Sequence, residues 1–120
     1  MLSLLAIVLF SQQPITFSQE GVASYYTVAS SSTLTASGET MVDEALTCAM
    51  REGVFGGYYR VTSDNGRSVV VRLNDRGPYV KGRDIDLSEA AMKILDPTMQ
   101  KGILQVRIDR IIESEIPPLF

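Results

Sequence analysis

The stretch YYRVTSDNGRSVVVRL, residues 58–73, constrains the fold more than any other part of this sequence. Its apolar residues alternate with polar ones, as in two half-buried strands; they are Tyr59, Val61, Val69, Val71 and Leu73. Between the two runs lies Asn65-Gly66, a pair that supplies the positive φ angles of a tight turn. We therefore predict a β-hairpin here.

The rest of the chain adds short elements. Residues 21–28 mix small, aromatic and β-branched residues and predict a first strand, and residues 103–111 alternate as a last strand. Residues 86–96 predict a helix with Ser88 as its N-cap. Residues 41–52 fit a helix or a strand. Several short strands with one short helix indicate a compact β-barrel or sandwich, and closure of a barrel removes exposed sheet edges.

Composition excludes several classes of function. A chain of 120 residues is expected to form one domain, and its net charge of −3 argues against a nucleic-acid partner. The sequence contains no histidine and one cysteine, Cys48, which we expect in the core. The usual metal-site spacings cannot be built, and no phosphate-binding glycine pattern occurs, so we expect neither a metal nor another cofactor.

The first residues, MLSLLAIVLF, form an apolar run that is too short to cross a bilayer as a helix. Followed by a polar segment, the run indicates a signal peptide over residues 1–18, although no Lys or Arg precedes it. The alternative is a buried N-terminal strand. We expect export to the periplasm or cell envelope without a lipid anchor, because no cysteine lies near the cleavage site, and a single domain over residues 19–120.

The segments GVASYY, TASGE, ALTCAM and the long stretch from YRVTS through NDRGPYV to DLSEAA occur in the order typical of the rare lipoprotein A (RlpA) family. The chain resembles that family over about residues 21–111. The resemblance implies a mainly β fold, a six-stranded double-psi β-barrel with one or two short helices. It also implies lytic cleavage of the bond between N-acetylmuramic acid and N-acetylglucosamine in peptidoglycan glycan strands. A monomer is expected.

The resemblance points to two carboxylates. Asp75 corresponds to the acidic residue of the NDRGP motif, and Glu39 to the glutamate of TASGE. A lytic transglycosylase needs one acid/base, because the C6 hydroxyl of muramic acid is itself the nucleophile; Asp75 would act there and Glu39 would assist electrostatically. Arginines beside a carboxylate favour its ionised form, so Arg72 and Arg76 could oppose this role. The alternative for Asp75 is a turn at a strand end.

Five further residues are expected to bind substrate: Tyr26, Thr35, Asn74, Arg76 and Arg83. A tyrosine face can stack on a sugar, although alternation places one residue of the Tyr25-Tyr26 pair in the core. Thr35 could orient a carboxylate or serve only its own turn. The arginines could hold wall carboxylates or form ion pairs within the chain.

Two positions depart from the family pattern. Met50 occupies the place of a typical histidine, and Val42 that of an aspartate, with Asp43 displaced by one residue. The loss of the histidine keeps two other functions open: an expansin-like module that binds wall glycan without turnover, and a protein-binding or inhibitory barrel.

Overall fold

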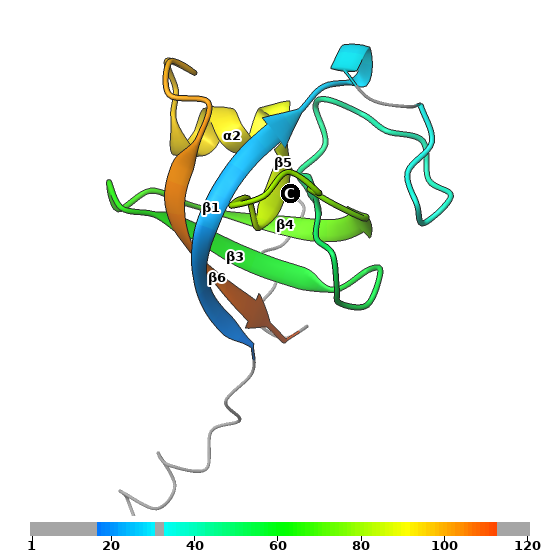
Figure 1. The fold of residues 1–120 in the computed structure, drawn as a ribbon, viewed down its shortest axis with the longest axis horizontal. Coiled ribbons are helices and arrows are strands. Elements are labelled where there is room, and N and C mark those ends of the chain that lie inside the picture. The colour runs from blue at the N-terminus through cyan, green and yellow to red at the C-terminus, as the bar shows by residue number, and fades with distance from the viewer. Residues whose placement is uncertain (1–16, 31–32, 113–120) are drawn as a thin grey trace, which may run out of the picture.

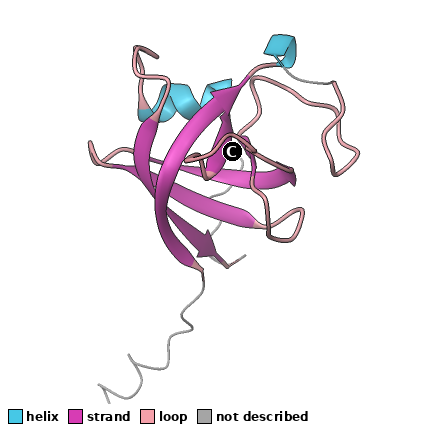
Figure 2. Ribbon diagram, in the orientation of Figure 1, coloured by secondary structure: helices cyan, strands magenta, loops and turns pink. Residues whose placement is uncertain are grey.

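A computed structural model describes residues 17–30 and 33–112. Its strands form a closed barrel in the order β1-β5-β2-β4-β3-β6, in which β6 pairs back with β1 (Figures 1 and 2). The elements are β1 (Ser18–Tyr26), η1 (Val28–Ser30), β2 (Thr47–Ala49), β3 (Tyr58–Ser63), β4 (Ser68–Asp75), β5 (Ile85–Ser88), α2 (Glu89–Leu95) and β6 (Leu104–Ile111). The predicted mainly β barrel of six strands is confirmed.

The predicted hairpin is also confirmed. Strands β3 and β4 pair antiparallel, with Val61 opposite Val69. Of the two predicted turn residues, Gly66 has a positive φ, 89°, whereas Asn65 does not. Asn65 instead serves the turn through its side chain, which accepts a hydrogen bond from the Arg67 amide at 2.9 Å. Strand β6 falls where alternation indicated it, and β1 starts three residues before the predicted segment.

The sequence pattern did not predict two short strands, β2 and β5. Residues 41–52, which fitted a helix or a strand, contain the three-residue strand β2, and β5 is only four residues long. All three residues of β2 are buried, so the strand shows no alternation of apolar and polar side chains. Both strands are held by neighbours distant in sequence, since β2 pairs parallel with β4, and β1 pairs parallel with β5.

The barrel interior is filled by apolar side chains from all six strands and from α2. The largest fully buried ones include Leu73, Ile85, Leu87, Met92 and Ile108. Cys48 belongs to this core, as predicted, and burial raises the pKa of its thiol. The thiol therefore stays protonated and serves packing.

Helix α2 begins as predicted. The Ser88 side chain accepts a hydrogen bond from the Ala91 amide at 3.3 Å, and Ser88 is completely buried. The helix lies at one end of the barrel, next to the end of β1 (Figure 1). In residues 17–30 and 33–112, no helix is both long and apolar enough to cross a membrane.

The expected signal peptide, residues 1–18, lies outside the described residues except for Phe17 and Ser18. Ser18 opens β1, and its hydroxyl donates a 2.6 Å hydrogen bond to Asp109 on β6. The ring of Phe17 meets that of Tyr59 edge to face, with 6.0 Å between centroids. The barrel packing therefore includes these two residues.

The Ser88 cap gives a test of the fold. Replacing Ser88 with Ala should lower the free energy of unfolding by about 1–2 kcal/mol, because the first turn of α2 loses its buried acceptor. The measurement is urea denaturation followed by circular dichroism. Ser68→Ala, at an exposed strand end, should change stability by less than about 0.5 kcal/mol. Equal effects of the two changes would contradict the capping role.

Candidate active site

A β-bulge in β4 decides where Asp75 points. On β2, Cys48 is opposite Leu73, but the next residue, Ala49, is opposite Asp75, so Asn74 is the extra residue. Because side chains alternate along a strand, an unbulged β4 would direct Asp75 to the same side as Leu73, into the core. The bulge turns Asp75 away from Leu73 to the same face as Ala49; Asp75 is half-buried there, and Ala49 is buried.

Asp75 belongs to a row of residues that runs across four neighbouring strands. Ser24 on β1 is opposite Asp86 on β5, Asp86 is opposite Ala49 on β2, and Ala49 is opposite Asp75 on β4. Residues in register on adjacent strands face the same side of the sheet. We name these four residues the carboxylate row. In this row the carboxyl groups of Asp75 and Asp86 lie one on each side of the small Ala49 side chain, with about 10 Å between the two aspartate Cα atoms.

The Asp75 carboxylate is anchored through one oxygen. Its Oδ1 accepts hydrogen bonds from the backbone amides of Ala36, at 2.8 Å, and Arg76, at 2.9 Å. Within the described part of the chain, Oδ2 has no hydrogen-bond partner, and the residue is only half-buried. One carboxyl oxygen is thus fixed, while the other remains available to a substrate.

Asp86 is the second carboxyl of the row, and the sequence analysis did not single it out. Its Oδ1 accepts a 3.0 Å hydrogen bond from the Ser24 hydroxyl. Burial raises the pKa of Asp86, and the negative charge of Asp75 adds to the rise, against the opposing effects of Ser24 and Arg83. A carboxyl that holds its proton to higher pH is suited to general acid chemistry. In the sequence, Asp86 is one of the charged residues of GRDIDLS. That local pattern does not show that Asp86 aligns with Asp75 across β2.

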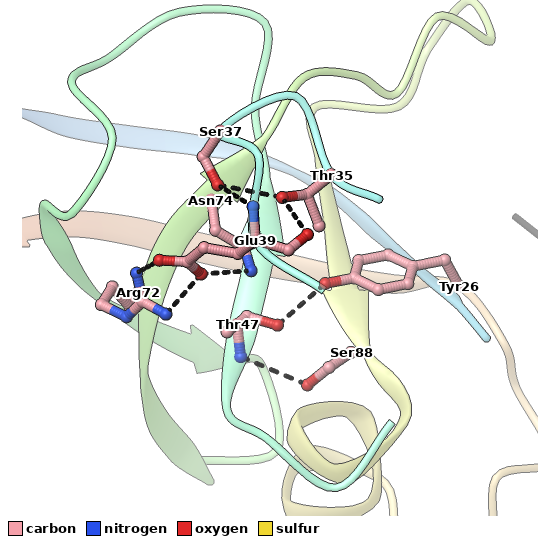
Figure 3. Close-up of polar contacts among 8 residues, drawn as sticks. All are labelled: Tyr26, Thr35, Ser37, Glu39, Thr47, Arg72, Asn74 and Ser88. Carbon is pink, nitrogen blue, oxygen red and sulfur yellow. Dashed lines mark hydrogen bonds and ion pairs between the residues drawn. The ribbon is translucent and has the colours of Figure 1, made fainter. Parts of the chain in front are cut away.

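Tyr26 cannot serve as the expected sugar-stacking surface. Its exposed fraction is 4%, and its hydroxyl hydrogen-bonds to that of Thr47 at 2.9 Å (Figure 3). Burial raises the pKa of Tyr26 to about 12, and the nearby charges of Asp75 and Asp86 contribute. The buried Tyr26 ring therefore supports the site by packing beneath it. Tyr25, the other candidate, is partly buried against the hydrophobic core.

Glu39 is bound by Arg72 and Asn74. Both Arg72 Nη atoms donate 2.7 Å hydrogen bonds to its carboxylate, and Asn74 Nδ2 donates another at 3.2 Å (Figure 3). The Arg72 guanidinium, followed by the Asn74 amide, lowers the pKa of Glu39. Its charge is therefore neutralised by Arg72. Because Asn74 is the bulge residue, Glu39 also holds the element that orients Asp75.

The loop that carries Glu39 is ordered by its own small polar residues. Thr35, 5% exposed, donates its hydroxyl to the Glu39 carbonyl at 3.0 Å and shares a 2.9 Å hydrogen bond with the Ser37 hydroxyl (Figure 3). The Ser37 amide donates to the Asn74 carbonyl at 3.1 Å. Thr35 therefore orders its own turn, which is the alternative that the sequence left open. Asn74 is 3% exposed, so it too orders the site from beneath.

The Arg76 guanidinium is directed away from the Asp75 carboxylate. It donates to the carbonyls of Met50, at 3.4 Å, and Gly53, at 2.7 Å, and lies 4.1 Å from the centre of the Phe55 ring. In this structure it therefore does not clamp Asp75, and its expected role in substrate binding stays a prediction. Arg83 is half-buried near Asp86, where its charge lowers the pKa of that carboxyl.

The two departures from the family pattern have structural roles. Met50 is 7% exposed and packs in the core, although it also lines a cleft with Arg51, Tyr59 and other residues. The Asp43 carboxylate accepts a 2.8 Å hydrogen bond from the Val28 amide and so holds η1. Neither residue replaces the lost side chain chemically. In the described ranges, no group of three or more carboxylates and thiols is placed to hold a metal ion.

Comparison with known proteins gives one consistent result. Residues 18–108 match the protein family described as lytic transglycolase. The chain is 46% identical over 98 residues to a probable endolytic peptidoglycan transglycosylase RlpA of Nostoc sp., covering 79% of this chain and 26% of the relative. It is 44% identical over 105 residues to the Escherichia coli endolytic peptidoglycan transglycosylase RlpA, covering 87% and 28%. The chain thus spans about a quarter of these relatives' length.

Two solved structures share the fold. A Streptomyces papain inhibitor aligns with a TM-score of 0.66 at 24% identity, covering 82% of this chain and 98% of the inhibitor. An expansin of Clavibacter michiganensis aligns with a TM-score of 0.63 at 21% identity, covering 84% and 54%. At these identities the likeness concerns the barrel alone.

The carboxylate row predicts an electrostatic coupling that can be measured by pH titration. Asp75→Asn should lower the pKa of Asp86 toward the usual aspartate value, because the variant removes a negative charge that raises it. Carboxyl-carbon NMR of labelled protein follows each aspartate separately. Asp64→Asn, at the exposed hairpin turn, should leave Asp86 unchanged. An Asp86 pKa that is equal in all three proteins would show that the two carboxyls do not interact.

Proposed function

This chain belongs to the RlpA family of lytic transglycolases, and from that premise we propose that it cleaves peptidoglycan glycan strands between N-acetylmuramic acid and N-acetylglucosamine. The observation that carries the proposal is the carboxylate row: Asp75 presents an open oxygen, and Asp86 lies across Ala49 with a raised pKa. Because peptidoglycan lies outside the cytoplasm, we expect this protein to be located there.

In the proposed reaction, Asp75 protonates the glycosidic oxygen as the bond to C1 of the muramic acid breaks. The C6 hydroxyl of the same sugar attacks C1, and Asp75 takes the proton that this hydroxyl loses. The product has a 1,6-anhydro end, and the acid is restored without water. General acid–base assistance of this kind contributes about 10²–10⁴-fold to a rate.

In this proposal, Asp86 takes over the titratable role of the histidine that the family pattern has at the position of Met50. Burial, and to a smaller extent the neighbouring charge of Asp75, raises the pKa of Asp86. A carboxyl with a raised pKa holds its proton to higher pH. We propose that Asp86 stores a proton in the row and that Asp75 is the member that contacts the leaving oxygen.

Glu39 acts in this proposal by positioning. Its charge is neutralised by Arg72, so it offers little electrostatic help to a developing cation, in contrast to the role expected from the sequence. Its hydrogen bond to Asn74 instead supports the bulge that orients Asp75. The supporting observation is geometric: one side chain connects the TASGE loop to the bulge residue.

The activity itself is tested with sacculi from which the stem peptides have been removed. The protein should release fragments with anhydro ends, detected by mass spectrometry, and Asp75→Asn should lower the rate by about 10²–10⁴-fold. Asp64→Asn is the matched control, with the same chemical change far from the row, and should retain full activity.

The outcomes separate three functions. Binding to sacculi without products from the parent protein would favour a glycan-binding module. Absence of both binding and products would favour the protein-binding barrel. Full activity of Asp75→Asn would refute the assignment of the acid.

Two substitutions of Glu39 distinguish positioning from electrostatic assistance. Glu39→Gln preserves an acceptor for Asn74 and should retain activity within about threefold, whereas Glu39→Ala should lose about 10–100-fold because Asp75 is displaced. The comparison uses initial rates on the same substrate, with folding checked by circular dichroism. An equal loss in both variants would assign the role to the charge of Glu39.

A further inference from the structure

Two loops border the carboxylate row and are tied to each other. The first, residues 50–57, follows β2, and the second, residues 76–84, joins β4 to β5. The second loop therefore begins next to Asp75 and ends two residues before Asp86. We call these segments the paired loops.

Two arginines connect the paired loops in opposite directions. Arg51, on the first loop, donates from Nη1 to the carbonyls of Pro78, at 2.9 Å, and Arg83, at 2.6 Å, on the second. Arg76, on the second loop, donates to the carbonyls of Met50 and Gly53 on the first. Hydrogen bonds from charged donors are stronger than neutral ones, so this reciprocal pair holds both loops rigidly against each other.

The second of the paired loops carries a large, exposed aromatic side chain, that of Tyr79. Tyr79 is 78% exposed, the highest fraction among the exposed large hydrophobic residues that the structure describes, and within the same residues no hydrogen bond holds its hydroxyl. Its ring lies over Gly77, where an added Cβ would be 3.7 Å from a ring carbon. Gly77 has a φ of 123°, which favours glycine. The nearby Phe55 ring, by contrast, is covered by the Arg76 guanidinium.

We propose that Tyr79 is a stacking platform for an N-acetylhexosamine ring of the glycan strand, beside the bond on which Asp75 acts. The inference rests on the proposed function for the identity of the ligand. A pyranose ring presents a face of C–H groups, which packs on an aromatic face, and its hydroxyl and acetamido groups remain solvated. The support comes from continuity, since Tyr79 lies on the loop that connects the two carboxyls of the row.

The rigidity of the paired loops makes such a platform effective. A ring on a mobile loop would lose conformational freedom on binding, at a cost to affinity. Here Arg51 already fixes the loop on both sides of Tyr79, at Pro78 and Arg83. The exposed ring therefore needs little reorganisation to receive a sugar.

The test measures binding apart from turnover. In an Asp75→Asn background, which removes the proposed acid, Tyr79→Ala should weaken co-sedimentation with stem-peptide-free sacculi by about tenfold, equivalent to one stacking contact. Tyr79→Phe should bind like the background, because the ring face remains. Val80→Ala, an exposed neighbour on the same loop, is the matched control and should bind within about twofold. Thermal melting should be unchanged in all variants.

The outcomes separate the platform from the activity. Tyr79→Ala that binds like the background, or Val80→Ala that weakens binding equally, would overturn the inference, and so would failure of the background protein to sediment with glycan. A loss confined to Tyr79→Ala supports it, even if the wild-type protein releases no anhydro-ended product, in which case only the proposed cleavage fails. With an active wild type, Tyr79→Ala should raise KM about tenfold and leave kcat nearly unchanged.

Discussion

The bulge at Asn74 is the constraint on which the site depends. A closed barrel directs alternate side chains inward, and the regular continuation of β4 beyond Leu73 would bury Asp75 in an apolar core. One extra residue in the strand reverses this and turns the carboxylate away from Leu73, in register with Ala49 and Asp86. A buried charge would be costly, whereas the outward one can meet a ligand.

Three arginines near the bulge are engaged by groups other than the Asp75 carboxylate. Arg72 pairs with Glu39, while Arg76 and Arg51 bind loop carbonyls. These charged side chains thus have separate roles. The Arg72–Glu39 pair supports the bulge through Asn74. Arg76 and Arg51 hold together the loops that carry the proposed sugar platform.

In the proposed mechanism, the proton chemistry is distributed differently from the family pattern. Met50 contributes to packing, and no histidine is present in the chain. The carboxyl with a raised pKa is Asp86, which owes the rise mainly to burial. The barrel provides that burial, because β5 lies between β1 and β2. A short strand that the sequence pattern did not predict therefore carries a central group of the proposed mechanism.

The sequence by itself determined several local elements and, through the family resemblance, singled out one candidate carboxylate. Alternation and Asn65-Gly66 specified the hairpin, Ser88 the start of the helix, and the NDRGP motif pointed to Asp75, because each signal lies within a few neighbouring residues. Only the tertiary structure decided which way Asp75 faces, that Asp86 is its neighbour, and that Tyr26 is covered. These features depend on the register between strands distant in sequence, and a one-residue shift of register exchanges the two faces of a strand.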